Sequence, residues 1–349
     1  MDRGARSMSP SEVAGIGFVD ARTILTPASG FIRRYRYSLN PYSGCRFACE
    51  YCYARAFAPT AEKRRTWGEW ASAKRNAAAL ITKACADGTL QSGDAIYMSS
   101  ATDPYQPAEH RLRLTRSILE AILASGVQPR LTVQTRSPIV ARDIDLFQQF
   151  EYIRVNISVT TDSEQVRLRY EPKAPAIKAR LRAARALGDA GIPIGISISP
   201  MLPLGDVEAF ANTVASLNAA EYVSQYMAPP GPIFAAGTLP ATLRMAQEDG
   251  WGLAQYAAAR DVIQTVLGAD RPLLEGDAGF APVSAPRLPE GGPAGGLGGP
   301  AGQHRVDERA QRGLPGIGEL IAGTQDALRH VDERGEVDRR PGDDEVNRG

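Results

Sequence analysis

Hydrophobic and polar positions follow two alternating patterns between about residues 30 and 228. Runs rich in β-branched and aromatic residues predict strands at 35–39, 95–99, 131–135, 152–159, 192–199 and 222–227. Between them, apolar positions at helical spacing predict helices at 70–85, 112–124, 141–150, 176–190 and 207–218. Gly126 and Gly191 stand where a helix ends before a strand. Repeated strand–helix units imply parallel strands, in an open doubly wound sheet or a barrel, and six units favour a partial (β/α)6 TIM-type barrel.

The regions outside this pattern divide the rest of the chain. Residues 1–29 form an N-terminal extension, and residues 229–289 predict one or two helices of uncertain packing with no strand to close a barrel. The run EGGPAGGLGGP at 290–300 opposes any regular element, because glycine and proline both disfavour it. We therefore expect 290–349, which is charged and poor in aromatic residues, to be a disordered tail.

Three of the four cysteines lie within eight residues, as Cys45-Arg-Phe-Ala-Cys49-Glu-Tyr-Cys52, just after the first predicted strand. Thiolates this close are typical of iron–sulfur or zinc sites. Three ligands in one loop can hold three irons of a cubane and leave the fourth iron without a protein ligand. A structural zinc site needs a fourth ligand. The other candidates for that place are Cys85 and the scattered His110, His304 and His330.

The ends of the other predicted strands are also dense in polar residues, as in SSATDPYQPAE, QTRSP and SVTTD. Ligand chemistry in β/α folds gathers at the carboxyl ends of the strands. The loop C-x3-C-x-aromatic-C, with Tyr51 before the last cysteine, resembles the signature of the radical S-adenosylmethionine (SAM) superfamily. The wider stretches YSLNPYSGCRFACEYCYAR and SSATDPYQPAE resemble its spore photoproduct lyase and DNA-repair-photolyase-like branch.

The resemblance implies one 4Fe–4S cluster on Cys45, Cys49 and Cys52, with SAM chelating the open iron. One electron into the cluster would cleave the C5′–S bond of SAM, and the 5′-deoxyadenosyl radical would abstract hydrogen from a substrate. A flavodoxin- or ferredoxin-type protein is the electron donor that this chemistry implies. No other cysteine cluster is present in the sequence, which argues against auxiliary iron–sulfur centres.

By the same resemblance, further strand-end residues would bind the cofactor. Tyr51 would lie beside the cluster and the adenine, and the strip 99–103, with Ser100, Thr102 and Asp103, near the SAM amino group. The remaining candidates are Arg136 for the SAM carboxylate, Ser158 for the ribose, Glu171 in a supporting role and Pro200 near the adenine.

Each of these residues also has an ordinary structural explanation. Asp103-Pro104 is a common turn sequence, Ser158 suits a strand, and Arg136 could pair with a surface acid. One position departs from the lyase branch, because Ser100 stands where the lyase has a cysteine that returns hydrogen to the product radical. A hydroxyl is a much poorer hydrogen-atom donor than a thiol. Cys85, on a predicted helix, fits a small buried hydrophobe better than a replacement.

Composition and charge leave the partner open. The net charge of +1 demands no polyelectrolyte partner, and the 43% hydrophobic content is that of an ordinary globular protein. The N-terminus has no apolar signal region and no apolar run is long enough for a membrane, so we expect a cytoplasmic protein without a membrane partner. Two basic clusters flank the cysteine loop in the sequence and are candidate nucleic-acid contacts: Arg33, Arg34 and Arg36, and Lys63, Arg64 and Arg65. The alternative is a solvated or acid-paired surface.

Three hypotheses follow from the sequence. The first is a radical SAM enzyme acting on nucleic acid or a nucleotide-derived molecule, and the second has the same chemistry on a protein or small molecule. The third is a non-catalytic iron–sulfur or zinc protein.

Overall fold

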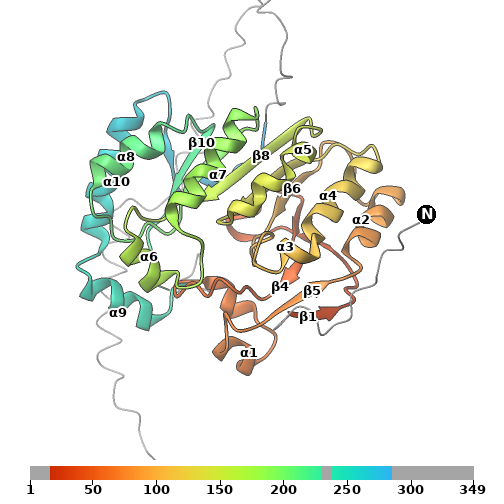
Figure 1. The fold of residues 1–349 in the computed structure, drawn as a ribbon, viewed down its shortest axis with the longest axis horizontal. Coiled ribbons are helices and arrows are strands. Elements are labelled where there is room, and N and C mark those ends of the chain that lie inside the picture. The colour runs from red at the N-terminus through yellow and green to blue at the C-terminus, as the bar shows by residue number, and fades with distance from the viewer. Residues whose placement is uncertain (1–15, 230–236, 285–349) are drawn as a thin grey trace, which may run out of the picture. The chain divides into compact units, whose positions relative to one another are not determined.

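The computed structural model describes residues 16–229 and 237–284 of the chain. Its centre is an eight-stranded sheet in the order β11-β10-β9-β8-β7-β6-β3-β2 (Figure 1). The strands of this sheet are β2 Leu25–Pro27, β3 Tyr37–Leu39, β6 Ala95–Met98, β7 Arg130–Thr135, β8 Tyr152–Ser158, β9 Ile194–Ile198, β10 Glu221–Ser224 and β11 Leu273–Leu274. All neighbours pair in parallel except β2, which runs antiparallel to β3.

The strand order identifies the architecture. From β3 to β11 the parallel strands follow one another in chain order, whereas a doubly wound sheet reverses its order at a switch point. The two end strands, β2 and β11, do not pair with each other, so the barrel is open. The predicted partial β/α barrel and its six strands are therefore confirmed, with β11 as a seventh parallel strand that the sequence did not predict.

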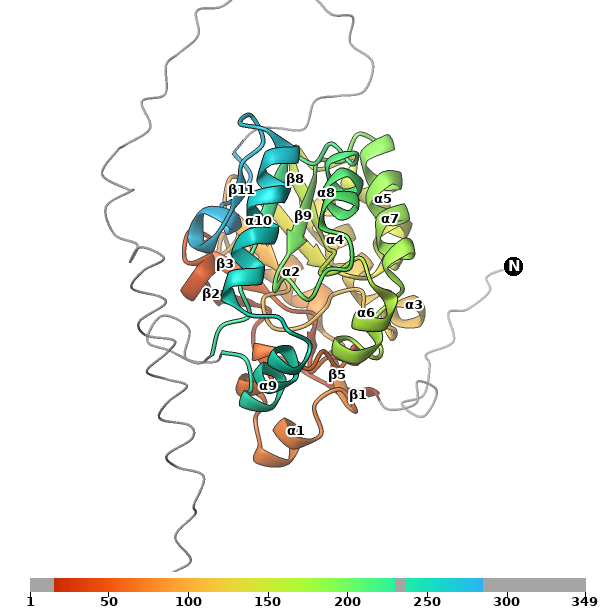
Figure 2. The same ribbon diagram turned by 90° about the vertical axis from the view of Figure 1, so that its left-hand side faces the viewer.

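Helices follow one another around the outside of the sheet (Figures 1 and 2). Their bounds are α2 Ala77–Ala86, α3 Glu109–Leu112, α4 Leu114–Ala124, α5 Ile144–Phe147, α6 Glu164–Tyr170, α7 Ile177–Asp189, α8 Val207–Ala215, α9 Pro240–Glu248 and α10 Leu253–Leu267. Short 3-10 turns are η2 Gly30–Ile32, η3 Tyr53–Phe57, η4 Pro138–Asp143 and η5 Gly276–Phe280. Gly126 and Gly191, both with positive φ, end α4 and α7 as predicted.

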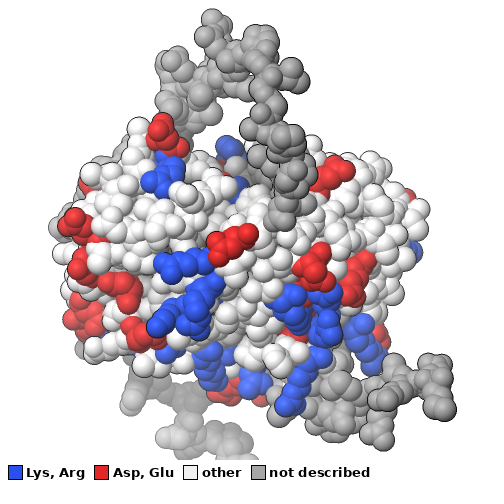
Figure 3. Space-filling view, turned by 45° about the horizontal axis from the view of Figure 1, so that its top comes forward, with Lys and Arg blue, Asp and Glu red and all other residues white. Residues whose placement is uncertain are grey.

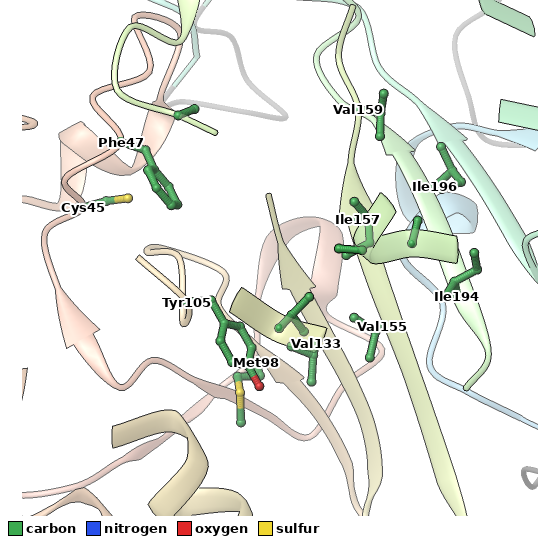
Figure 4. Packing of buried hydrophobic residues seen from close by; sticks show 14 of the residues in the cluster. Cys45, Phe47, Met98, Tyr105, Val133, Val155, Ile157, Val159, Ile194 and Ile196 are labelled. Atoms are coloured by element: carbon green, nitrogen blue, oxygen red, sulfur yellow. The ribbon is translucent and has the colours of Figure 1, made fainter. Parts of the chain in front are cut away.

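The core lies between these helices and one face of the strands. Figure 4 shows Val133, Val155, Ile157 and Ile196 on successive strands, and all four are buried. Burial of such side chains is the main favourable term in folding. Because side chains alternate across a strand, the opposite face of each strand points into the barrel.

The region 70–85, predicted as one helix, contains a strand followed by a shorter helix. Ala71–Lys74 forms strand β5, and the helix α2 begins only at Ala77. In β5, buried Ala71 and Ala73 alternate with half-buried Ser72 and Lys74, but alanine and lysine are poor strand formers, so the sequence did not reveal the strand. Strand β5 pairs with β1 (Ile16–Val19) and β4 (Tyr42–Ser43) in a separate three-stranded sheet.

Two other element predictions need correction. The helix predicted at 141–150 is the turn η4 followed by the four-residue α5, with Pro138 at the start of the turn. Beyond residue 229, α9 and α10 confirm the expected helices, but β11 adds the strand that was not expected. It has only two residues, too few for a periodic signal. The predicted tail at 290–349 and residues 1–15 of the predicted extension lie outside the described residues.

The inner face of the barrel is polar, and its base is closed by residues from both ends of the described chain. The Tyr35 hydroxyl and Arg154 Nη2 both donate to the carbonyl of Ala281, at 2.9 and 2.8 Å. The Phe280 ring lies 6.3 Å from the Tyr97 ring. Figure 2 shows this C-terminal segment beside β2 and β3. The carboxyl ends of the strands therefore form the barrel's one open end.

In the ranges 16–229 and 237–284, no helix combines the length and the apolar character that crossing a membrane requires.

Glu221 at the start of β10 makes the stability of the barrel base depend on pH. Burial raises the pKa of its carboxyl from 4.5 to about 7, although Arg154 opposes the shift. The folded state thus holds this proton more tightly than the unfolded chain, so the stabilisation is fully present below pH 4.5 and is lost as the pH rises through 7. We expect Glu221→Gln to lose less unfolding free energy than the wild type between pH 5 and 7.5, measured by urea denaturation. A steeper loss in the variant would contradict this.

Candidate functional site

The three-cysteine loop begins at the end of β4, in the small sheet. Gly44 has φ +75°, in the left-handed region, and a Cβ there would lie 2.5 Å from the Trp70 ring. Only glycine fits this position, because a side chain would be strained by the backbone and would also collide with the tryptophan. The loop thus turns tightly against β5 before it presents Cys45. The sequence placed the cysteines directly after the strand at 35–39, but the two-residue β4 of the small sheet comes between that strand and Cys45.

Cys45 and Cys49 are buried and Cys52 is half-buried. Burial raises the pKa of the Cys45 thiol to about 12, while the backbone N–H groups of Phe47 and Asp103 lower it. Burial likewise raises the pKa values of Cys49 and Cys52. At Cys52, the backbone N–H groups of Ala54 and Arg55 oppose the shift and lower the pKa. N–H donors thus face the sulfurs of Cys45 and Cys52, which a metal would hold as thiolates.

Arg136, at the end of β7, is the cation beside the cysteine loop. Its Nη1 donates to Cys49 Sγ at 3.1 Å, to the Tyr51 hydroxyl at 2.7 Å and to Glu171 Oε1 at 2.7 Å. A positive charge at this distance favours the thiolate, and it lowers the pKa of Cys49 against the effect of burial. Three residues proposed from the sequence, Tyr51, Arg136 and Glu171, therefore meet at one cysteine.

The Glu171 carboxylate is the common hydrogen-bond acceptor for the side chains beside Cys49. It accepts hydrogen bonds from the Tyr51 hydroxyl, the Thr160 hydroxyl at 2.9 Å and Arg180 Nη2, in addition to Arg136. Glu171 and Arg180 are both fully buried. Burial alone would raise the pKa of Glu171, but the two arginines outweigh it and hold the pKa at about 2. Glu171 is thus an anion that fixes Arg136 at the loop.

Asp103, at the end of β6, organises the strand ends. Its carboxylate accepts from the Tyr105 N–H at 2.9 Å, the Thr135 hydroxyl at 2.7 Å and the Arg136 N–H at 2.9 Å. Because both carboxylate oxygens have partners within the chain, Asp103 positions the start of the Arg136 segment. Its proposed contact with a cofactor amino group remains a prediction.

The other residues proposed from the strand ends have different surroundings. Ser100 Oγ accepts from Asn40 Nδ2 at 3.3 Å, and Ser158 Oγ accepts from Gln134 Nε2 at 2.8 Å. Pro200 follows β9, with a half-buried side chain. Thr102 Oγ1 and the neighbouring Ser99 Oγ are buried hydroxyls without a hydrogen-bond partner in the described structure. Buried polar atoms of this kind are costly unless a ligand or water satisfies them.

These observations meet the requirements of a three-thiolate iron–sulfur centre with a polar organic ligand beside it. The donor set is soft sulfur from one loop, with N–H donors and a guanidinium directed at it. The unsatisfied hydroxyls of Ser99 and Thr102 supply polar groups at the adjacent strand end. Within 16–229 and 237–284, no three His, Cys, Asp or Glu side chains converge closely enough to hold a single metal ion. Cys85 lies on α2 and packs against the hydrophobic core, as expected for a small hydrophobe.

The two basic clusters occupy different parts of the fold. Arg33 and Arg36 precede β3 at the base, where they pair with Asp277 and Asp94. Lys63, Arg64 and Arg65 end the helix α1 (Ala61–Arg65), which follows the cysteine loop. On the face in Figure 3, basic side chains gather in the lower half beside acidic ones.

Sequence reasoning missed two buried groups that support the site. Arg180 lies in α7 on the stripe that also holds Ile177, Ala184 and Leu187, and a charge on an apolar stripe was a signal that it has a buried partner. Gln106 follows the Asp103 turn and reaches the cysteine loop. Nothing in its sequence surroundings distinguishes a buried glutamine from an exposed one.

A partial β/α barrel with a three-thiol loop next to its strand ends fits a class of proteins with a thiolate-bound metal centre. The family model described as the radical SAM superfamily matches residues 39–216, and the chain belongs to this superfamily. The superfamily prediction from the sequence is thereby confirmed. Membership implies a 4Fe–4S cluster and SAM in general terms.

The chain is also similar to individual proteins. It is 36% identical to an uncharacterized protein of Methanocaldococcus jannaschii, over 50% of this chain and 63% of that protein. It is 32% identical to an uncharacterized protein of Acidianus two-tailed virus, over 48% of this chain and 56% of the relative. An uncharacterized protein of Mycobacterium tuberculosis is 29% identical, over 48% and 50%. The chain thus spans about half to three fifths of the length of the curated relatives that it matches.

Among solved structures, spore photoproduct lyase complexed with dinucleoside spore photoproduct is 18% identical, with a TM-score of 0.45, and the match covers 60% of this chain and 62% of that one. The radical SAM methyltransferase TsrM from Kitasatospora setae is 13% identical, with a TM-score of 0.41, over 64% and 43%.

The buried Glu171 carboxylate gives a test of the arginine network. We expect Glu171→Gln to lower the unfolding free energy by about 3 to 5 kcal/mol, because it leaves two buried arginines without their anion. The matched control, Glu248→Gln, removes an exposed partner of Arg169 and should cost less than about 1 kcal/mol. Chemical denaturation at pH 7 measures both.

A comparison of the wild type with Glu171→Gln over a range of pH tests the charge state of Glu171. Its pKa of about 2 lies below the unfolded value of 4.5, so its ionic contribution is present above pH 4.5 and is lost as the pH falls toward 2. The stability difference between the wild type and Glu171→Gln should therefore narrow over that range. A difference that stays constant would show that the carboxylate does not act as an anion.

Proposed function

We propose that the protein is a radical SAM enzyme that holds one 4Fe–4S cluster on Cys45, Cys49 and Cys52 and binds SAM at the iron without a cysteine. The observation that carries this proposal is the single loop of three thiols, with backbone N–H donors at Cys45 and Cys52 and the Arg136 guanidinium at Cys49. When bound, the cluster and SAM supply a one-electron cleavage of the C5′–S bond, which yields a radical able to abstract hydrogen from a substrate.

The chain's own residues have defined tasks in this proposal. Arg136 supplies a fixed positive charge for an anionic group of the ligand, such as a carboxylate, while Glu171 and Tyr51 hold its side chain in place. The Ser99 and Thr102 hydroxyls would gain the partners that they lack. Asp103 keeps the ends of β6 and β7 in register through Thr135 and the Arg136 N–H.

We propose nucleic acid, or a molecule derived from it, as the substrate class. The strand-end motifs resemble the DNA-repair-photolyase-like branch, and the spore photoproduct lyase structure named above holds a dinucleoside photoproduct. Arg64 and Arg65 are exposed on α1, which contacts η3, and η3 ends at Phe57, a residue that is 64% exposed. Basic side chains beside an exposed ring are the usual means of binding a single strand.

The chemistry of the proposed substrate step is limited by Ser100. A hydroxyl at this position does not replace a thiol as hydrogen-atom donor, so the proposed reaction is not the thymine-dimer repair of the lyase by its cysteine route. The electron that the cluster needs would come from a flavodoxin- or ferredoxin-type protein.

Cysteine variants test the cluster. After anaerobic reconstitution with iron and sulfide, the wild type should be brown, with absorption near ~400 nm, and should release 5′-deoxyadenosine from SAM under dithionite. Cys45→Ala, Cys49→Ala and Cys52→Ala should each lose both properties, because a ligand to one iron is missing. The matched control Cys85→Ala should keep both. A colourless wild type that holds zinc would overturn the proposal.

Charge variants of α1 test the substrate class. We expect replacement of Lys63, Arg64 and Arg65 by alanine to weaken binding of a fluorescent single-stranded oligonucleotide. It should also reduce the slope of log K against log salt by about 2, as expected for three lost phosphate contacts. The control replaces three exposed basic residues of α7, Lys178, Arg182 and Arg185, by alanine and should leave both quantities unchanged. If the wild type does not bind at low salt, the substrate is a protein or a small molecule.

A further inference from the structure

A buried glutamine connects the end of β6 to the cysteine loop. Gln106 is completely buried, and its side-chain amide makes two hydrogen bonds to the backbone on either side of Cys45. Nε2 donates to the Gly44 carbonyl at 3.3 Å, and Oε1 accepts from the Arg46 N–H at 3.1 Å. One side chain therefore satisfies both backbone groups that flank the first cysteine.

The turn that carries Gln106 is itself fixed in place. Asp103 accepts the Tyr105 N–H at 2.9 Å, Thr115 donates to the Pro104 carbonyl at 2.5 Å, and the Glu109 N–H donates to the Gln106 carbonyl at 2.8 Å. The Glu109 carboxylate also accepts from the hydroxyl of Tyr42 in β4, at 2.5 Å. Since the turn has little freedom, the Gln106 amide is a rigid support for the loop.

The backbone on both sides of Cys45 depends on this support. Gly44 has a positive φ, and a glycine at this position leaves the backbone before Cys45 free to adopt other conformations unless it is held. Cys49 is contacted directly by Arg136, and Cys52 lies at the start of η3. The orientation of the Cys45 peptide units depends on Gln106, and a buried carbonyl or N–H without a partner would favour a different conformation.

We infer that Gln106 is a positioning residue for Cys45. It fixes the direction of this one thiol toward the proposed cluster and joins its position to that of the Thr102–Asp103 turn. This inference rests on the proposed function, because it concerns the iron that Cys45 would hold. Gln106 touches neither metal nor substrate and acts through the backbone of Gly44 and Arg46.

The test compares Gln106→Leu, Gln106→Glu and the control Thr132→Val in the full chain, each reconstituted anaerobically. Leucine removes both hydrogen bonds, whereas glutamate keeps an acceptor for Arg46 but cannot donate to Gly44 when ionised. Thr132→Val removes a buried hydrogen bond with Tyr35 at the barrel base, so it lowers stability without touching the loop. The measurements are the rate of iron release to a chelator, the EPR spectrum of the reduced cluster, and the unfolding temperature.

We expect Gln106→Leu to release iron roughly tenfold faster than the wild type, with an altered EPR spectrum. Gln106→Glu should lie between the two. Thr132→Val should release iron at the wild-type rate, even if its unfolding temperature falls as much as that of Gln106→Leu. Equal iron release in all four proteins would overturn the inference while leaving the proposed function intact. A wild type that assembles no cluster would overturn the proposed function itself.

Discussion

The ion pair between Arg136 and Glu171 is the interaction on which the arrangement of the site depends. Glu171 is fully buried, and its charge is tolerable only because Arg136 and Arg180 neutralise it and because Tyr51 and Thr160 donate to it. These partners come from β7, α7, the cysteine loop and the end of β8. One carboxylate therefore fixes the loop against three separate parts of the barrel.

The polar residues beside this ion pair are arranged in two groups with different tasks. Asp103 and Gln106, on one turn, hold the backbones of the Arg136 segment and of the cysteine loop. The hydroxyls of Ser99 and Thr102, near the same turn, are buried without partners. The first group makes the site rigid, and the second leaves it chemically unsatisfied. A rigid site with unsatisfied groups is what the binding of a polar ligand requires.

The sequence predicted the barrel because its strands and helices are long enough to show their periods. It predicted the meeting of Tyr51, Arg136 and Glu171 only through a family resemblance, since the three are far apart in the chain. Strand β5 was missed because its residues, ASAK, have low strand propensity, and β11 was missed because it has only two residues. The two basic clusters precede and follow β3 in the chain, and their role as nucleic-acid contacts stays a prediction. Gln106 was missed because burial of a polar side chain is decided by its tertiary partners.

The central claim is that three thiols leave one iron open to a chelating ligand. The most direct measurement is the EPR spectrum of the reduced, reconstituted protein, recorded before and after addition of SAM. We expect a reduced cubane signal that shifts when SAM is added, because SAM would change the coordination of one iron. A spectrum that does not respond to SAM, from a cluster held by four protein side chains, would contradict it.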